Sequence, residues 1–155
     1  MIASSRSPRS TGATIGLVVV DHGSRRVESN LRHEEAVVAW RERSGFAVVE
    51  PAHMELAEPS VGSAFDACVS AGASTVVIAP YFLGPGRHWD HDIPSLAAEA
   101  AARHPGVRYL VSAPLGPHEM LMQLLGLRVA HCLGRASGDL PGCESCGGTP
   151  RCLLR

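Results

Sequence analysis

The chain has 155 residues and a formal net charge of −1 at pH 7, and 45% of its residues are hydrophobic against 19% charged. This length suits one domain and hardly two, and the apolar content excludes wholesale disorder. The balanced charge gives no global basic field, which argues against a dedicated nucleic-acid-binding protein. No apolar run approaches the roughly 18–20 residues of a membrane span.

Strand and helix patterns alternate through the middle of the chain. Residues 14–20 form a continuous apolar run, as expected of a strand that is covered on both faces. Further strands are predicted over residues 46–49, 74–79 and 107–112. Helical patterns follow the strands, the first ending near Arg43 and the others covering 59–70, 94–103 and 118–133, with a loop over 80–92. This order favours the α/β class, with a four-stranded, mostly parallel sheet and helices on both faces.

The two ends of the chain differ from this middle part. Residues 1–13 contain no acidic residue, which is typical of a disordered terminus or of the remnant of an organelle transit peptide. Residues 134–155 are rich in glycine, proline and cysteine, and such a segment cannot form a core without a cross-link. We therefore predict an α/β domain over residues 14–133 and an irregular, cysteine-rich tail over residues 134–155.

Polar residues follow each predicted strand at its carboxyl end, where open parallel sheets bind their ligands. Imidazole and carboxylate groups together suit a divalent first-row metal, or proton transfer near neutral pH. The absence of a Gly-x-Gly-x-x-Gly motif and of a Walker loop disfavours a nucleotide site. Six side chains could face this edge of the sheet: His22, His53, Glu55, His88, His91 and His118.

Four of the five cysteines lie in the last 24 residues, and Cys68 stands apart in a predicted helix as a small hydrophobic residue. A C-x-x-C pair supplies two thiolates from one tight turn, which suits Zn²⁺ and an iron–sulfur cluster equally well. Spacing alone does not decide between these two, and free thiols or disulfides stay open. The four tail cysteines are Cys132, Cys143, Cys146 and Cys152.

Four motifs, in order along the chain, resemble those of the small class II chelatases. They are DHGSRR at 21–26, PAHMELAEPS at 51–60, PYFLGPGRHWDHDIP at 80–94 and APLGPH at 113–118. With its cysteine-rich tail, the chain is most similar to the plastid type of this family. The resemblance implies a flavodoxin-like chelatase fold, a place in the chloroplast stroma, and insertion of Fe²⁺ into sirohydrochlorin in the last step of sirohaem synthesis.

Two other functions stay open beside that one. Bacterial relatives of this small type can use Co²⁺ in cobalamin synthesis, so a cobaltochelatase on the same scaffold is the first alternative. The second belongs to another class, a metal carrier or redox sensor that keeps the fold without turnover.

The resemblance also implies roles for residues in these motifs. His22 and His88 would handle the metal, and Glu55 would be a further proton acceptor or a weak ligand. Asp21 stands where bacterial members often have glycine, and it could orient the ring of His22, attract Fe²⁺ or cap the turn. Three arginines beside the motif histidines are plausible partners for the carboxylates of the substrate, namely Arg25, Arg26 and Arg87.

The same resemblance implies that all four tail cysteines hold a [2Fe–2S] cluster, with Zn²⁺ as the alternative. Larger chelatases of this class look like two such halves fused, so we expect a homodimer, with sirohydrochlorin and Fe²⁺ as its ligands. Nucleic acid is not an expected partner. The roles of His53, His91 and His118 stay open.

Overall fold

The structure, a computed structural model, describes residues 14–142 and residue 145. The chain divides into two compact units, Met1–Gly116 and Pro117–Arg155, which we call the first and the second unit. None of the described helices combines the length and the apolar character that a membrane crossing requires.

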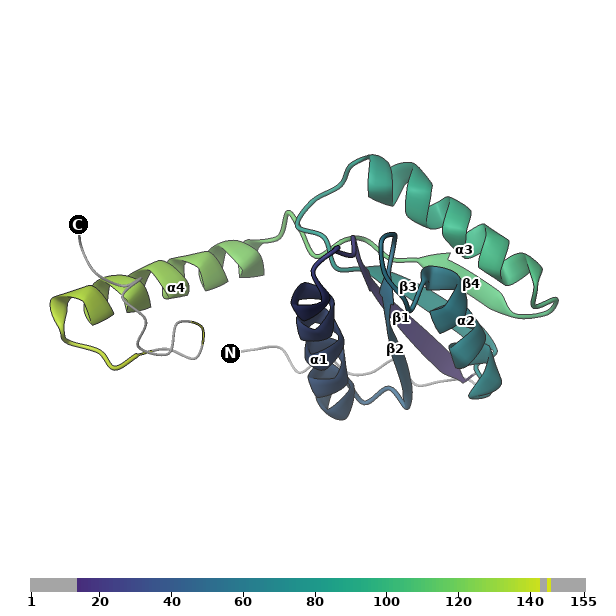
Figure 1. Cartoon of the computed structure of the whole chain (residues 1–155), viewed down its shortest axis with the longest axis horizontal. Coiled ribbons are helices and arrows are strands. Elements are labelled where there is room, and N and C mark those ends of the chain that lie inside the picture. Colours follow the sequence, from purple (N-terminus) through teal and green to yellow (C-terminus); the bar gives the residue numbers. More distant parts are fainter. Residues whose placement is uncertain (1–13, 143–144, 146–155) are drawn as a thin grey trace. The chain divides into compact units, whose positions relative to one another are not determined.

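A four-stranded sheet forms the centre of the first unit (Figure 1). Its strands are β1 (Ile15–Asp21), β2 (Val48–His53), β3 (Thr75–Pro80) and β4 (Arg108–Val111). They lie in the order β2-β1-β3-β4, and every neighbouring pair is parallel. The predicted α/β class and parallel sheet are confirmed. The chain leaves β1 toward one edge and leaves β3 toward the other, so the loops after these two strands flank the point where such sheets bind ligands.

Helices cover both faces of this sheet (Figure 1): α1 (Val27–Ser44) lies on one face, and α2 (Val61–Ser70) and α3 (Ile93–Ala102) lie on the other. Alternate residues of β1 point to opposite faces, so Val19 packs in a cluster with Val37 of α1, whereas Val18 packs with α2 and α3. The apolar run at the start of the chain is therefore buried on both sides.

Strand β2 differs from the prediction, which ended it at residue 49. It continues through Pro51 to His53 and pairs with β1 along its whole length. A proline is tolerated here because β2 is an edge strand. The backbone N–H of His53, two residues further on, donates to Pro59 outside the sheet, so the missing N–H of Pro51 also lies on the side away from β1.

The predicted loop over residues 80–92 is also corrected. Its last five residues form a π-helical turn, η1 (His88–Asp92), which runs directly into α3. The indole N–H of Trp89 donates to the carbonyl of Ser112 at 2.9 Å and so fixes this turn against the end of β4. Single π-helical turns within helices occur frequently at functional sites.

Helices α2 and α3 are joined by one carboxylate. Asp66 accepts hydrogen bonds from His104 Nε2 at 2.6 Å and from Arg103 Nη2 at 2.9 Å. The hydrogen bond from His104, and then that from Arg103, lower the pKa of Asp66 below its usual 3.8. A lowered carboxyl pKa contributes stability above the usual value, and this contribution is lost as the pH falls through the lowered one.

We expect the Asp66→Asn variant to be less stable at pH 7 by less than about 1 kcal/mol, because Asp66 is half exposed and its ion pairs are screened by water. The difference from the wild type should shrink as the pH falls below about 4. Urea unfolding of both proteins at pH 7 and pH 3 measures it. A difference that grows on acidification would contradict this account.

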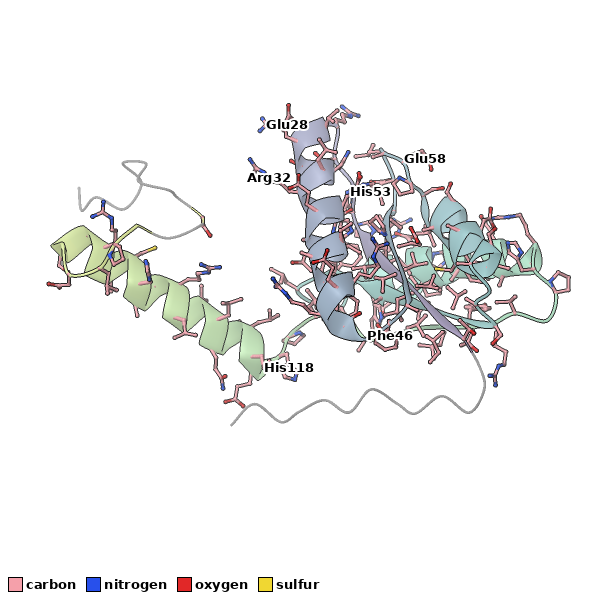
Figure 2. All side chains as sticks on the ribbon, turned by 90° about the horizontal axis from the view of Figure 1, so that it is seen from below. Glu28, Arg32, Phe46, His53, Glu58 and His118 are labelled. Carbon is pink, nitrogen blue, oxygen red and sulfur yellow. The ribbon has the colours of Figure 1, made fainter. Side chains whose placement is uncertain are left out.

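In the second unit, α4 spans Glu119–Ser137 and ends at Gly138, whose φ of 88° is the left-handed conformation typical of a helix C-terminus. His118 precedes the helix, and its Nδ1 accepts the backbone N–H of Met120 at 3.2 Å (Figure 2 labels it at the start of α4). His118 therefore serves as the N-cap of α4. The assignment of this helix to a domain over residues 14–133 stays a prediction.

Candidate active site

Three loops at the carboxyl ends of neighbouring strands bring the main predicted residues together. His22 follows β1 directly, Glu55 lies two residues after β2, and His88 opens η1 in the connection after β3. The rings of His22 and His88 meet edge to face with their centroids 5.1 Å apart. His22 Nε2 lies 3.0 Å from Glu55 Oε1. We call these three residues the candidate cluster.

The candidate cluster is open to a ligand. About half of each side chain is exposed: 44% for His22, 52% for Glu55 and 47% for His88. A cavity of about 310 Å³ adjoins it, lined by Met54, Glu55, His88, His91, Asp92, Ser95 and Leu96. Within the described part of the chain, no three His, Cys, Asp or Glu side chains are arranged to hold a metal ion by themselves. The cluster therefore does not form a closed metal cage.

The close approach of His22 and Glu55 depends on the backbone at Gly23. The N–H of Met54 donates to the carbonyl of Asp21 at 2.8 Å, and that of Glu55 donates to the carbonyl of His22 at 3.2 Å. These bonds continue the pairing of β1 and β2 beyond the sheet. Gly23 has a φ of 83°, and a Cβ atom there would lie 1.9 Å from the carbonyl oxygen of Glu55. Only glycine fits this turn without displacing Glu55.

His88 is held by a carboxylate that the sequence analysis did not assign. Asp92 Oδ2 lies 2.8 Å from His88 Nδ1, and its other oxygen lies 3.3 Å from His91 Nδ1. The hydrogen bond with His88, followed by that with His91 and the charge of Arg87, lowers the pKa of Asp92. An ionised carboxylate only accepts hydrogen bonds, so Nδ1 of His88 carries a proton, and in the neutral imidazole the lone pair is then on Nε2. The i, i+4 spacing of a histidine and an aspartate was the sequence signal for this pair.

We expect the Asp92→Ala variant to lower the rate of the reaction at this site about 10- to 100-fold, the usual cost of losing a carboxylate that orients a metal-binding histidine. Asp90→Ala is the matched control, since Asp90 is an exposed aspartate of the same turn. Steady-state rates of both variants, at a temperature where both are folded, provide the measurement. Equal rates in the two variants would show that Asp92 does not orient His88.

Asp21 and His53 lie behind the cluster. Asp21 Oδ1 accepts the N–H of Gly23 at 2.9 Å and lies 2.6 Å from His53 Nδ1. Of the three roles considered for Asp21, capping the turn is the one for which a contact is present. His53, the last residue of β2 and the register partner of Asp21, is fully buried and so does not reach the open edge of the sheet.

The three predicted arginines are exposed, and they lie close in sequence to His22 and His88. Arg25 and Arg26 precede α1, and Arg87 is 85% exposed with its Nε 3.9 Å from Asp92 Oδ1. Their guanidinium groups are therefore accessible to an anionic ligand. His91 is also largely exposed and lines the cavity.

The two cysteines that the structure describes differ in exposure. Cys68 is fully buried, and burial, with the charge of Glu50 as a second cause, raises the pKa of its thiol to about 12. Cys132 is exposed on α4. The thiolate is the form that binds metals, so Cys132 is suited to a ligand role and Cys68 is not. The other three tail cysteines lie outside the described residues: Cys143, Cys146 and Cys152.

Comparison with known sequences places this arrangement among chelatases. The family model CbiX matches residues 16–132. The chain is 53% identical to the chloroplastic sirohydrochlorin ferrochelatase of Arabidopsis thaliana over 92% of its own length and 64% of that protein. It is 33% identical to the sirohydrochlorin cobaltochelatase of Priestia megaterium over 73% of its length and 37% of that protein. The chain thus spans less than two thirds of the length of these curated relatives.

Solved structures of similar fold are also chelatases. The sirohydrochlorin chelatase SirB of Bacillus subtilis subspecies spizizenii, in complex with cobalt, matches with a TM-score of 0.69 and 30% identity over 76% of this chain and 50% of that one. SirB of Bacillus subtilis with Fe³⁺ matches with a TM-score of 0.68 and 28% identity over 83% and 48% of the two chains. A putative cobalamin biosynthesis CbiX protein of Marinobacter aquaeolei VT8 has a TM-score of 0.66 and 26% identity over 78% and 98%.

Proposed function

The chain belongs to the CbiX family, and from this premise we propose that it is a sirohydrochlorin ferrochelatase, an enzyme that inserts Fe²⁺ into sirohydrochlorin to give sirohaem. The observation that carries the proposal is the 53% identity, over 92% of the chain, to a ferrochelatase with this substrate. The cluster of His22, Glu55 and His88 supports it, because these groups can bind a divalent metal and accept protons.

The proposed mechanism follows from the proton balance of the reaction. Sirohydrochlorin loses two inner N–H protons when Fe²⁺, the second substrate, enters the ring. His88 would offer its Nε2 lone pair to the metal, since Asp92 occupies its Nδ1. His22 Nε2, which can also bind the metal, would accept one ring proton and the carboxylate of Glu55, 3.0 Å from it, would accept the other; both would release their protons to water, to which each side chain is about half exposed. Few ligands hold the iron, so it can leave for the ring.

The substrate is a polycarboxylate, and we propose that the exposed arginines bind its carboxylates. Guanidinium groups recognise carboxylates through paired hydrogen bonds. The residues proposed for this contact are Arg25, Arg26 and Arg87.

Cobalt insertion is the second candidate function, because the chain is also 33% identical to a cobaltochelatase. The two are separated by offering Fe²⁺ or Co²⁺ with sirohydrochlorin to the purified protein and following the absorption of the product. Faster insertion of Fe²⁺ at equal free metal is the expected result. Faster insertion of Co²⁺ would favour the alternative, and no insertion of either metal would favour a metal carrier or redox sensor.

We further propose that Cys132 and the cysteines at 143, 146 and 152 hold a [2Fe–2S] cluster, with Zn²⁺ as the alternative. The exposed thiol of Cys132 fits this role. The cluster would supply one-electron redox chemistry. Iron and acid-labile sulfide are expected in the purified chain, and Cys132→Ser should lower both, whereas Cys68→Ala should not. Zinc without sulfide would point to the alternative.

A homodimer in the chloroplast stroma completes the proposal. The chain matches only about half of each SirB chain, so two copies would supply what one SirB chain holds. The relative from Arabidopsis is chloroplastic. Sedimentation at working concentration should give the mass of two chains, and a monomer would refute the dimer.

A further inference from the structure

We infer that the buried pair of His53 and Asp21 is a positioning pair, which sets the placement of His22 relative to Glu55, and that His53 is therefore a functional residue of this site. The inference rests on the proposed function only in so far as His22 and Glu55 form the reactive site. His53 touches neither the metal nor the tetrapyrrole in this account.

The position of the pair in the sheet is the first argument. Asp21 and His53 are opposite each other in the final register pair of β1 and β2. His22 follows Asp21 directly, and Glu55 comes two residues after His53. Beyond this pair two backbone bonds, from Met54 N–H to Asp21 and from Glu55 N–H to His22, still join the segments before they separate toward α1 and α2. A contact that fixes this last pair therefore helps to fix the backbone from which both reactive side chains start.

The side-chain contacts of the pair are the second argument. The 2.6 Å contact between His53 Nδ1 and Asp21 Oδ1 joins the two strands at their last register pair. The same oxygen accepts the N–H of Gly23 at 2.9 Å, so the carboxylate ties His53 to the turn that carries His22. The imidazole is wholly buried, and its backbone N–H is held by Pro59 at 2.8 Å. The Nδ1–H group of His53, which donates to Asp21, is therefore held in one place.

The third argument is that stability alone does not explain a histidine here. Within the described residues, no hydrogen bond reaches His53 Nε2, although the nitrogen is buried. Glu34 Oε1 lies 3.5 Å away, which is too long for a good hydrogen bond. A buried polar atom without a partner destabilises a fold, and an apolar side chain of similar size would avoid this cost. The benefit of the histidine then lies in its other nitrogen, the one that faces Asp21.

Three variants of the full-length chain test this inference. His53→Leu fills similar space without a donor. His53→Asn keeps an amide nitrogen near the position of Nδ1. His104→Leu is the matched control, because His104 forms the same kind of contact, from Nε2 to Asp66 Oδ1 at 2.6 Å, away from β1 and β2. The readouts are the affinity for Co²⁺ without tetrapyrrole, kcat and KM for sirohydrochlorin, and the midpoint of thermal unfolding.

We expect His53→Leu to weaken Co²⁺ binding and to lower kcat, each about 10- to 100-fold, while KM for sirohydrochlorin changes less than about threefold. The unfolding midpoint should shift by less than about 5 °C, because the unpartnered Nε2 is removed as well. His53→Asn should keep Co²⁺ affinity and kcat within about fivefold of the wild type. His104→Leu should leave the Co²⁺ affinity and kcat unchanged, whatever its effect on the midpoint.

Four results would overturn the inference: unchanged Co²⁺ affinity in His53→Leu, equal losses in His53→Leu and His53→Asn, an equal loss in His104→Leu, or no Co²⁺ binding by the wild type. If His53→Leu does not fold, His53→Gln is used in its place. The side chain of glutamine is longer than that of asparagine, so it carries the amide near the position of Nε2 instead of that of Nδ1. A wild type that binds Co²⁺ but inserts no metal would refute the proposed function alone, because the Co²⁺ affinities would still test the pair.

Discussion

The His22→Ala variant is expected to lose at least about 100-fold in kcat/KM for metal insertion into sirohydrochlorin, the range that a group acting in proton transfer contributes. His22 is the central member of the candidate cluster, since the centroid of its ring lies 5.1 Å from that of His88 and its Nε2 lies 3.0 Å from Glu55 Oε1. Its removal takes away a metal-binding nitrogen and the acceptor next to the carboxylate together. The initial rate of product absorption, with Fe²⁺ under anaerobic conditions, measures the loss.

The fold should survive this change, because the side chain of His22 is 44% exposed and its only other hydrogen-bond contact among the described residues is with the carbonyl of Gly23. His104→Gln is the control, a histidine of the same unit whose partner is Asp66 of α2. We expect its rate to stay within about twofold of the wild type. If His22 and His88 act as one unit, the double alanine variant should be no slower than either single variant. Turnover of His22→Ala within threefold of the wild type would refute the mechanism.

The fold was predictable from the sequence because burial on both faces leaves a simple pattern. The run Leu17–Val20 has no polar residue, since its side chains alternate between the helix on one face and the two on the other. Strands separated by helices then imply a parallel sheet. In such a sheet the carboxyl ends of neighbouring strands meet, and this alone brings residues 22, 55 and 88 to one edge.

The supporting residues of the site were not predictable in the same way, because their signals are local and ambiguous. Pro51 reads as a strand break, and only the edge position of β2 makes it compatible with the sheet. Ending β2 early placed His53 in a loop, so its burial and its contact with Asp21 were missed. Glycine and proline before residue 88 likewise hid the π-helical turn, and with it the contact of Asp92 with His88.

The second large effect is expected from a single methyl group. We predict that Gly23→Ala lowers the insertion rate about 100-fold, because its Cβ would lie 1.9 Å from the carbonyl oxygen of Glu55 and must push that backbone away from His22. A displacement of about 1 Å at reacting groups costs a factor of this size. The variant should also weaken Co²⁺ binding, since the displaced backbone would no longer hold His22 and Glu55 together.

Gly45→Ala separates this steric effect from backbone strain. Gly45 has nearly the same conformation, with a φ of 76° against 83°, but a Cβ atom there meets nothing within 4 Å. Both variants should lose about 1–2 kcal/mol of unfolding free energy from the left-handed conformation, and Gly23→Ala should lose more. Only Gly23→Ala should lose activity when rates are measured well below the unfolding midpoint. An equal loss of rate in both would mean that strain, transmitted through the fold, controls the site, whereas full activity of Gly23→Ala would mean that the contact of His22 with Glu55 is not needed for turnover.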